Sequence, residues 1–223
     1  MTDLKPEKMH GGDMIIWDWN GTLLNDIDIC IESINRLLDK RGRNRITKED
    51  YLKFFRFPVI DFYKDLGFDF EKESFNALSD EYINHYIRIE SNSSLHDGAL
   101  DLLNNFRSGH IKQVLLSAME QNTLAESVKK FNICHYFQEI VGVRNFYGHG
   151  KLDSARQFIE RTSVSPGSIT LLGDTIHDHE VAKTLGCNCI LISGGHQPYE
   201  KLITTGIRVE KNLAALFDLI TYS

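Results

Sequence analysis

The sequence predicts an α/β fold in which helices cover both faces of a parallel sheet. Short apolar runs alternate along the chain with segments whose apolar residues recur at helical spacing. Each apolar run ends in polar or glycine-rich residues, as buried parallel strands do. The predicted strands are residues 14–17, 113–117, 139–143, 169–172, 188–192 and 207–209. Because such sheets bind ligands beyond the carboxyl ends of their strands, we expect functional residues directly after these runs.

A long segment after the first strand breaks this alternation. Its apolar residues recur at helical spacing, which predicts an all-helical insert. The repeats are Ile27, Ile31, Ile34 and Leu38, then Phe75, Leu78, Tyr82, Tyr86 and Ile89. We therefore expect a core domain of residues 1–26 and 92–223 and a small helical domain of residues 27–91. The polar residues at 25–26 and 90–94 are the expected hinges.

Helical repeats also separate the later strands. They cover residues 99–106, 124–131 and 181–185. The last repeat is followed by Gly186, which predicts a helix end because glycine adopts the left-handed backbone conformation without strain.

Composition and charge exclude several classes of protein. The 223 residues are 42% hydrophobic and 25% charged, which excludes a disordered chain. The net charge is −6, so a basic face for nucleic acid is not expected. No stretch approaches the ~18 apolar residues of a membrane span, and the four cysteines form no CxxC pair. We expect a cytoplasmic monomer or homodimer with reduced thiols that binds neither nucleic acid nor membrane.

Acidic residues follow two of the predicted strands. Asp18 comes directly after the first strand, and Asp174 and Asp178 follow strand 169–172 through Gly173. Carboxylates at the ends of two strands of one parallel sheet can meet in space, and hard oxygen ligands suit Mg²⁺. A local interpretation stays open at this point, with Asp18 as a turn-forming acid and Asp178 as a helix N-cap.

Four segments, in order, resemble the motifs of the haloacid dehalogenase-like hydrolase superfamily. Residues 18–22, DWNGT, are similar to its DxDGT motif, and residues 173–178, GDTIHD, fit its GDxxxD motif. Between them, Ser117 closes a predicted strand and Lys151 precedes a predicted helix, as in the second and third motifs. The insert after the first motif resembles the helical C1 cap of phosphoglycolate phosphatase-like members. The resemblance implies a Rossmann-like core with an inserted cap.

The resemblance also implies a Mg²⁺-dependent phosphatase that acts on a small phosphorylated metabolite. Asp18 would attack phosphorus and form an aspartyl-phosphate, which water then hydrolyses. Mg²⁺ would be bound by Asp18, the backbone carbonyl of Asn20 and Asp174, with Asp178 in support.

The phosphoryl group would be held by residues of the second and third motifs. Ser117 and nearby backbone N–H groups would bind its oxygens, and Lys151 would neutralise charge that the metal does not reach. Trp19 and Ala118 are expected beside them as substrate-binding residues. From the cap, Arg56 is the candidate for contact with substrate, and an exposed arginine at a helix end is the alternative.

Position 20 departs from the family pattern. Family phosphatases have Asp there, which protonates the leaving oxygen and then activates water, whereas this chain has Asn20. An amide does not exchange a proton near neutral pH, and general acid–base help contributes roughly 10² to 10⁴ in rate. We therefore expect slow turnover of sugar or alkyl phosphates and faster turnover of acyl, aryl or anhydride phosphates.

Several histidines are candidates for the missing proton donor. His177 ranks first, with His149 and His179 behind it, and a surface-loop histidine is the alternative for each. Gly194, Gly195 and His196 follow the strand 188–192 and are expected to form a plain turn or a loop beside the phosphate.

Two other functions stay open. A dehalogenase-like hydrolase would need no metal, which the retained Asp174 and Asp178 disfavour, whereas a phosphonatase would need a cap lysine such as Lys53 or Lys64. A catalytically weakened phosphate-binding protein is the second alternative, which the missing acid at position 20 would permit.

Overall fold

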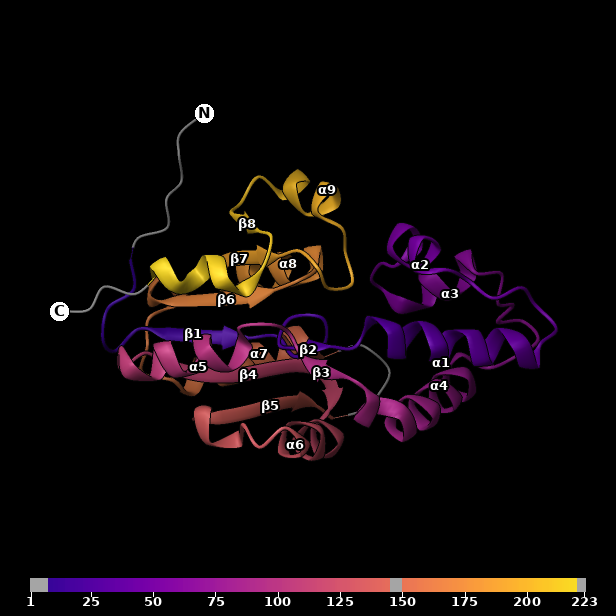
Figure 1. The fold of residues 1–223 in the computed structure, drawn as a ribbon, viewed down its shortest axis with the longest axis horizontal. Helices are drawn as coiled ribbons and strands as arrows, with labels where there is room; N and C mark the ends of the chain where they lie inside the picture. The colour runs from indigo at the N-terminus through magenta and orange to yellow at the C-terminus, as the bar shows by residue number, and fades with distance from the viewer. Residues whose placement is uncertain (1–7, 145–149, 220–223) are drawn as a thin grey trace.

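The computed structural model describes residues 8–144 and 150–219, and within them six strands form one sheet in the order β5-β4-β1-β6-β7-β8 (Figure 1). The strands are β1 Met14–Trp17, β4 Lys112–Glu120, β5 Glu139–Val143, β6 Ile169–Gly173, β7 Asn188–Ile192 and β8 Val209–Glu210. Each strand of this sheet pairs in parallel with its neighbours. The predicted α/β fold class is confirmed.

Helices cover both faces of the sheet. They are α5 Ala99–Ser108, α6 Gln121–Lys130, α7 Lys151–Arg161 and α8 Ile176–Leu185. The side chains of β1 alternate between the two faces, as the period of two in a strand requires. Ile15 and Trp17 pack with residues of α5 and α6, whereas Met14 and Ile16 pack with residues of α7 and α8. The strand at the centre of the sheet is therefore apolar throughout.

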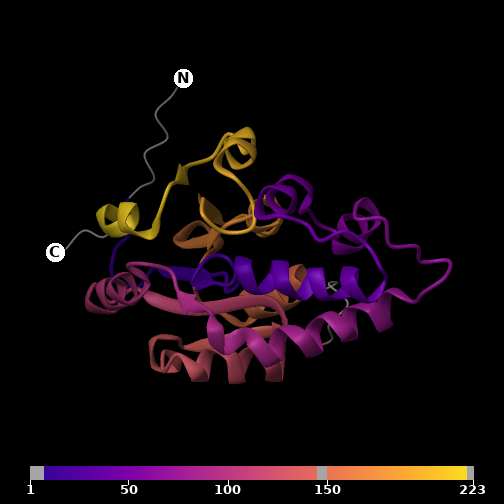
Figure 2. The same cartoon turned by 45° about the vertical axis from the view of Figure 1, so that its right-hand side comes forward.

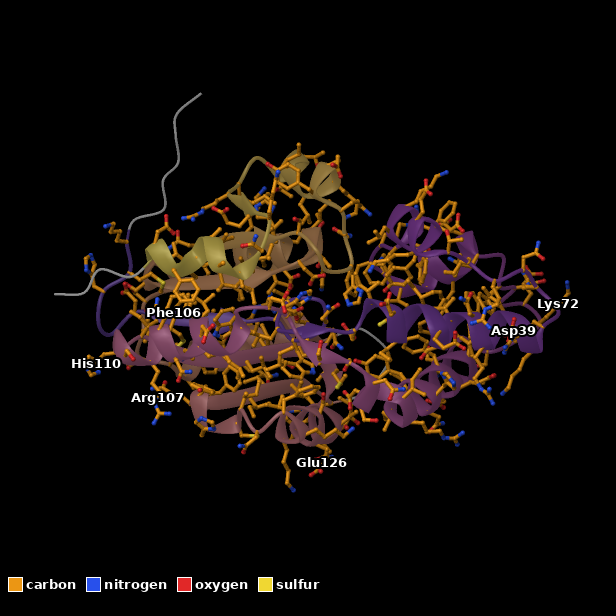
Figure 3. All side chains as sticks on the ribbon, viewed as in Figure 1. Asp39, Lys72, Phe106, Arg107, His110 and Glu126 are labelled. Atoms are coloured by element: carbon orange, nitrogen blue, oxygen red, sulfur yellow. The ribbon has the colours of Figure 1, made fainter. Side chains whose placement is uncertain are left out.

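Trp17 shows how this packing is anchored. Its ring meets that of Phe106 edge to face, with centroids 5.7 Å apart. Figure 3 shows Phe106 lying against the sheet from α5, while Arg107 and His110 point away from it.

The order of the strands places a switch point next to β1. After β1 the chain adds β4 and then β5 on one side, and it crosses to the other side to add β6, β7 and β8. The carboxyl ends of β4, β1 and β6 therefore lie together where the order reverses, which is where open α/β sheets bind ligands.

A helical insert follows β1. Its helices are α1 Ile27–Lys40, α2 Lys48–Phe54, α3 Val59–Asp65 and α4 Phe75–Ile89. They share a hydrophobic cluster of their own, in which Leu37, Phe62 and Leu78 are buried. In Figure 1 these helices lie beyond the end of the sheet to which the β1 arrow points. The insert, called the cap below, therefore stands over the switch point. Its limits at residues 27 and 91 stay a prediction.

A short antiparallel pair that the sequence did not indicate joins the chain leaving for the cap to the chain returning from it. β2, Leu24–Asn25, pairs with β3, Ser94–Leu95. The return also differs from the solvated hinge that its polar residues predicted. Glu90 is buried, accepts a hydrogen bond from Ser127 and pairs with Lys130 of α6. The connection is therefore fixed to the core.

The remaining helical segments are short. They are α9 Tyr199–Leu202, η1 Glu90–Asn92, η2 Cys134–Tyr136, η3 Pro166–Ser168, η4 Ile203–Thr205 and η5 Leu213–Leu219. Among residues 8–144 and 150–219, no helix has both the length and the apolar character needed to cross a bilayer.

Two predicted strands miss a limit by more than one residue. β4 runs on to Glu120, past the expected end at Ser117, with an irregularity in its pairing between Leu116 and Glu120. The last strand covers Val209–Glu210 and does not begin at residue 207. Both errors arise because apolar content predicts burial, whereas the limits of a strand depend on which backbone groups find partners.

Candidate functional site

Three carboxylates meet at the carboxyl ends of β1 and β6. Asp18 follows β1, and its N–H donates to the carbonyl of Leu172 at 2.8 Å. Asp174 follows β6, and Asp178 lies in the first turn of α8. Each of the three has a carboxylate oxygen within 4.8 Å of those of the other two. All three residues are buried, with 7%, 0% and 1% of their surface exposed in chain order.

Asp174 is held by close approach of the backbone. A Cβ atom at Gly21, where φ is +77°, would lie 2.3 Å from Asp174 Oδ2, and one at Gly195 would lie 2.2 Å from the same oxygen. The carboxylate accepts hydrogen bonds from the His196 N–H at 2.5 Å and the Thr22 hydroxyl at 3.1 Å. A side chain at position 21 or 195 would collide with this carboxylate, so glycine is required at both positions.

Asp178 supports the start of α8 without being its N-cap. Thr175 is the N-cap, and Asp178, two residues inside the helix, completes a capping box with it. Asp178 Oδ2 accepts from the Thr175 N–H at 3.0 Å and from its hydroxyl at 2.7 Å. The interpretation of Asp178 as the N-cap was wrong, because the N-cap lies three residues earlier. The other carboxylate oxygen of Asp178, Oδ1, faces the site and accepts a hydrogen bond from Lys151.

Lys151 brings a positive charge to the acids. It is the first residue of α7 and is only 4% exposed. Its Nζ lies 2.5 Å from Asp18 Oδ1 and 2.5 Å from Asp178 Oδ1. A buried ammonium is stable only with such partners, so Lys151 belongs to the same charged cluster.

The pKa values of the acids reflect burial and unequal pairing. Burial, which Lys151 offsets only in part, raises the pKa of Asp18 to about 8. Burial also raises the pKa of Asp174 to about 6, against the charge of His196. For Asp178 burial acts in the same direction, but Lys151 outweighs it and the pKa is lowered. One ammonium group, that of Lys151, is therefore too little positive charge to stabilise all three acids in their ionised form.

The donor set suits a divalent cation. When ionised, Asp18, Asp174 and Asp178 carry three negative charges against the one positive charge of Lys151, which leaves two uncompensated. Carboxylate oxygens are hard ligands of the kind that Mg²⁺ prefers. The missing positive charge and the oxygen ligands therefore both favour a divalent cation at this place.

The irregular part of β4 carries Ser117 and Ala118 to the same place. The Ser117 hydroxyl accepts a hydrogen bond from the Met119 N–H at 3.1 Å and lies 3.5 Å from Asn20 Oδ1. Both residues line a cavity of about 190 Å³ that Asp18 and Lys151 also line. Irregular pairing of this kind redirects side chains at the end of a strand.

Asn20 connects the core to the cap. Its amide donates to Asp26 Oδ2 and to the hydroxyl of Tyr86, which lies on α4, both at 2.8 Å. The Tyr86 hydroxyl in turn donates to Asp26 Oδ2 at 2.7 Å. An aspartate at position 20 would have no hydrogen to donate when ionised, and it would place a second carboxylate beside Asp26. The asparagine is therefore matched to its surroundings.

His196 is a member of the site for which the sequence predicted only a plain turn or a loop beside the phosphate. Its Nε2 lies 3.4 Å from Asp26 Oδ1, and its Nδ1 lies 3.0 Å from the hydroxyl of Tyr51 on α2. Burial favours the neutral ring, but Asp26 outweighs it and raises the pKa of His196 to about 9. His196 and Asp26 are far apart in the sequence, so no spacing pattern could have paired them.

The cap touches the core at a second point close to His196. Lys201 Nζ donates to the backbone carbonyl of Phe55 at 2.8 Å. Figure 2 accordingly shows the segment of α2 beside the chain that follows β7. With the contacts of Tyr51 and Tyr86, these bonds hold the cap over the cavity.

The structure does not bring two predicted substrate-binding side chains to the cavity. Trp19 is fully buried in the core, facing the same apolar cluster as Trp17, and its indole N–H donates to Ser127 Oγ at 3.0 Å. Its side chain continues the alternation of β1 and so points into the core and away from the cavity. Arg56 is exposed and pairs with Asp65 at 2.9 Å. Neither residue lines the cavity.

The other candidates are divided. His177 lines the cavity and stacks on Phe57, with ring centroids 4.7 Å apart. His149 lies outside the described residues. The candidates that do not line the cavity are His179, Lys53 and Lys64.

A family model matches most of the region that carries the site, up to four residues before His196. The model for the haloacid dehalogenase-like hydrolase family matches residues 15–192, from β1 to the end of β7. The chain belongs to this family. The resemblance drawn from the four motifs is thereby confirmed. A search of the curated proteins found no match.

Solved structures share the fold at low sequence identity. A haloacid dehalogenase-like hydrolase from Streptococcus pneumoniae has a TM-score of 0.80 at 19% identity, covering 92% of this chain and 96% of its own. A predicted phosphoglycolate phosphatase from Haemophilus somnus has a TM-score of 0.74 at 14% identity, with the same two coverages. CbbY from Rhodobacter sphaeroides, in complex with phosphate, has a TM-score of 0.70 at 15% identity, again covering 92% and 96%. At these identities the likeness concerns the fold.

Proposed function

We propose that this chain is a Mg²⁺-dependent phosphatase that hydrolyses a small phosphate monoester through an aspartyl-phosphate. One observation carries the proposal, namely the buried cluster in which Asp18, Asp174 and Asp178 face a single lysine in a cavity at the switch point. Names of structural neighbours that include phosphatases are consistent with it.

Asp18 is the proposed nucleophile. One of its oxygens forms a bond to phosphorus while the bond from phosphorus to the ester oxygen breaks. The ester oxygen leaves with the electron pair and takes a proton from water. A second water then attacks phosphorus and gives a proton to the hydroxide left by the first water, which restores the Asp18 carboxylate and releases inorganic phosphate. The overall reaction converts one ester and one water into one alcohol and one phosphate.

The other residues of the cluster act on charge and position. Asp18, Asp174 and the backbone carbonyl of Asn20 would hold Mg²⁺, with Asp178 in support. When bound, the ion neutralises phosphoryl charge so that an anion can attack an anion. Lys151 holds Asp18 in place and offers its ammonium to a phosphoryl oxygen. Ser117 and the backbone N–H of Ala118 are the proposed ligands of the remaining oxygens.

Removal of the metal tests the proposal. We expect EDTA to lower phosphate release from p-nitrophenyl phosphate and acetyl phosphate by about 10³ or more, because a Lewis acid contributes several kcal/mol. Added Mg²⁺ should restore the rate and raise the thermal unfolding temperature of the protein alone. An unchanged rate in EDTA would contradict the metal requirement. No release from either substrate with Mg²⁺ present would contradict the phosphatase itself and favour a binding protein.

Replacement of Asn20 tests how the leaving group is protonated. In Asn20→Asp the new carboxyl would lie beside the Asp26 carboxylate, and repulsion would favour its protonated form, which a general acid requires. We expect turnover of an alkyl phosphate to rise about tenfold or more relative to an aryl phosphate. Steady-state rates on benzyl and phenyl phosphate measure the ratio.

A matched control for this change is the double variant Asn20→Asp and Asp26→Asn, which exchanges the two groups and removes the repulsion. The gain on benzyl phosphate should be smaller in the double variant, since the new carboxyl then keeps an ordinary affinity for its proton. An equal gain on both esters in Asn20→Asp would count against a role in leaving-group protonation.

A further inference from the structure

The cavity that contains Asp18 has two walls of opposite character. On the side of the core it is lined by the acids, Lys151 and Ser117. On the side of the cap it is apolar and aromatic. That wall includes Ile34, Phe55, Phe57, Val59, Phe62 and Ile83.

The cap wall also carries Cys30, Tyr51, Tyr63, Tyr82 and Tyr86, and the hydroxyls of Tyr51 and Tyr86 are already engaged with the core. The Tyr51 hydroxyl pairs with His196, and the Tyr86 hydroxyl pairs with Asp26 and Asn20. A ligand in this part of the cavity therefore meets ring faces and aliphatic carbons, and it finds few groups that need a hydrogen bond.

The cap wall also lacks positive charge. Within the described ranges, no lysine or arginine of the cap lines the cavity. Figure 3 shows two charged residues of the cap, Asp39 and Lys72, at its outer end and pointing away from the sheet. On the core side, Lys151 is shared between Asp18 and Asp178. His196, the other cation that lines the cavity on this side, is paired with Asp26. A carboxylate or a second phosphate on the substrate would therefore lose water without gaining an unpaired counter-charge.

The size of the cavity limits the ligand as well. Its volume of about 190 Å³ is below the roughly 300–1,000 Å³ typical of sites for drug-sized molecules. A phosphoryl group with one ring or a short alkyl group suits this space.

We propose that the substrate is a phosphate monoester of a small, uncharged phenol. The proposal rests on the phosphatase function proposed above and adds its leaving group. The ring lies against Phe55, Phe57 and Phe62, while the phosphoryl group faces Asp18 and Ser117.

The chemistry at position 20 favours an aryl over an alkyl leaving group. A phenol has a pKa of about 10, whereas an alcohol is nearly as weak an acid as water, at about 16. An aryloxide therefore leaves with its electron pair before a proton reaches it, and it takes its proton afterwards from water. Asn20, which carries no exchangeable acidic proton, is adequate for this leaving group and inadequate for an alkoxide.

A panel of four esters separates the two parts of the proposal. Phenyl phosphate and 4-carboxyphenyl phosphate both release a phenol, and they differ in charge. Benzyl phosphate and 4-carboxybenzyl phosphate both release an alcohol, and they differ in the same way. We expect kcat/KM to fall about tenfold or more on adding the carboxylate within each pair. We also expect phenyl phosphate to exceed benzyl phosphate by about 10² or more.

A cation added to the cap wall should reverse the preference for an uncharged ligand. Val59 lines the cavity and is partly exposed, so Val59→Lys places an ammonium there. It should raise kcat/KM for 4-carboxyphenyl phosphate relative to phenyl phosphate about tenfold. The control is Ile87→Lys on α4, where the side chain is exposed and lies outside the cavity. It should leave the ratio unchanged.

Binding of inert phosphonates gives a readout that needs no turnover and does not depend on the folding of a variant. With Mg²⁺ present, benzylphosphonate should bind the unmodified protein at least about tenfold more tightly than phosphonoacetate by calorimetry. Equal or reversed affinities of the two phosphonates would overturn the inference. So would a phosphate ester that carries a carboxylate group, if it proved to be the best substrate of the panel. Absence of hydrolysis of every ester, with benzylphosphonate still preferred, would overturn the phosphatase function and leave the ligand preference standing.

Discussion

Replacing Asp18 with Asn is expected to lower kcat by about 10⁴ or more, because an amide oxygen does not form the covalent intermediate that the mechanism requires. The fold should survive, since Asn has the shape of Asp and the backbone N–H of residue 18 still donates to Leu172. Steady-state phosphate release measures the rate. Acid quenching of the unmodified enzyme with radiolabelled substrate should trap a phosphoprotein that the variant does not form.

The matched control for this experiment is Asp28→Asn. Asp28 has an 86% exposed side chain, lies in the first turn of α1 and is not among the residues that line the cavity. Its rate should stay within about twofold of the unmodified enzyme, because exposed charges contribute little. Phosphate release by Asp18→Asn at more than about a hundredth of the normal rate would show that another group is the nucleophile.

Replacing Lys151 with Met is expected to destabilise the fold by about 3 kcal/mol, with loss of activity. Met has a similar length and no charge, so Asp18 and Asp178 would lose the ammonium that lies 2.5 Å from both of them. Breaking one side of a buried ion pair leaves the other side buried without a partner, which is why the effect is large. Urea denaturation in the absence of Mg²⁺ measures the free energy of unfolding.

A double-mutant cycle identifies the origin of that loss. Combining Lys151→Met with Asp178→Asn removes both charges of one pair, so the double variant should lose clearly less than the sum of the two single losses. The control is Lys183→Met on the exposed face of α8, which should change stability by less than about 0.5 kcal/mol. Strictly additive losses would show that the pair between Lys151 and Asp178 does not stabilise the fold.

The candidate site was predictable to the extent that its residues follow strands. Asp18 and Asp174 lie directly beyond strands that apolar runs revealed, and parallel strands end at a common edge. Two other predictions did not lead to the cavity. The side chain of Trp19 follows the alternation of β1 into the core, and Arg56 has an acidic neighbour, Asp65, on the surface of the cap.

The roles of His196 and Asp26 were beyond the reach of the sequence. Each lies in an ordinary polar segment, and neither stands at a spacing that chemistry would require. Their pairing depends on the turn after β7 meeting the start of α1, with Tyr51 and Tyr86 closing from the cap. Contacts of this kind depend on how the cap is placed, and no local pattern encodes that placement.

The sequence by itself determined the class of fold, the order of strands and helices, the helical insert and the family, because these depend on periodicity and on short motifs. Only the tertiary structure decided which side chains face the cavity and how charge is balanced there. It decided as well that, among the described residues, the cap lines the cavity with aromatic rings and with no lysine or arginine. The physical reason is that hydrophobic burial is largely local in its pattern and tolerant of detail. Pairing of buried charges and the lining of a cavity depend instead on distances between segments remote in the chain.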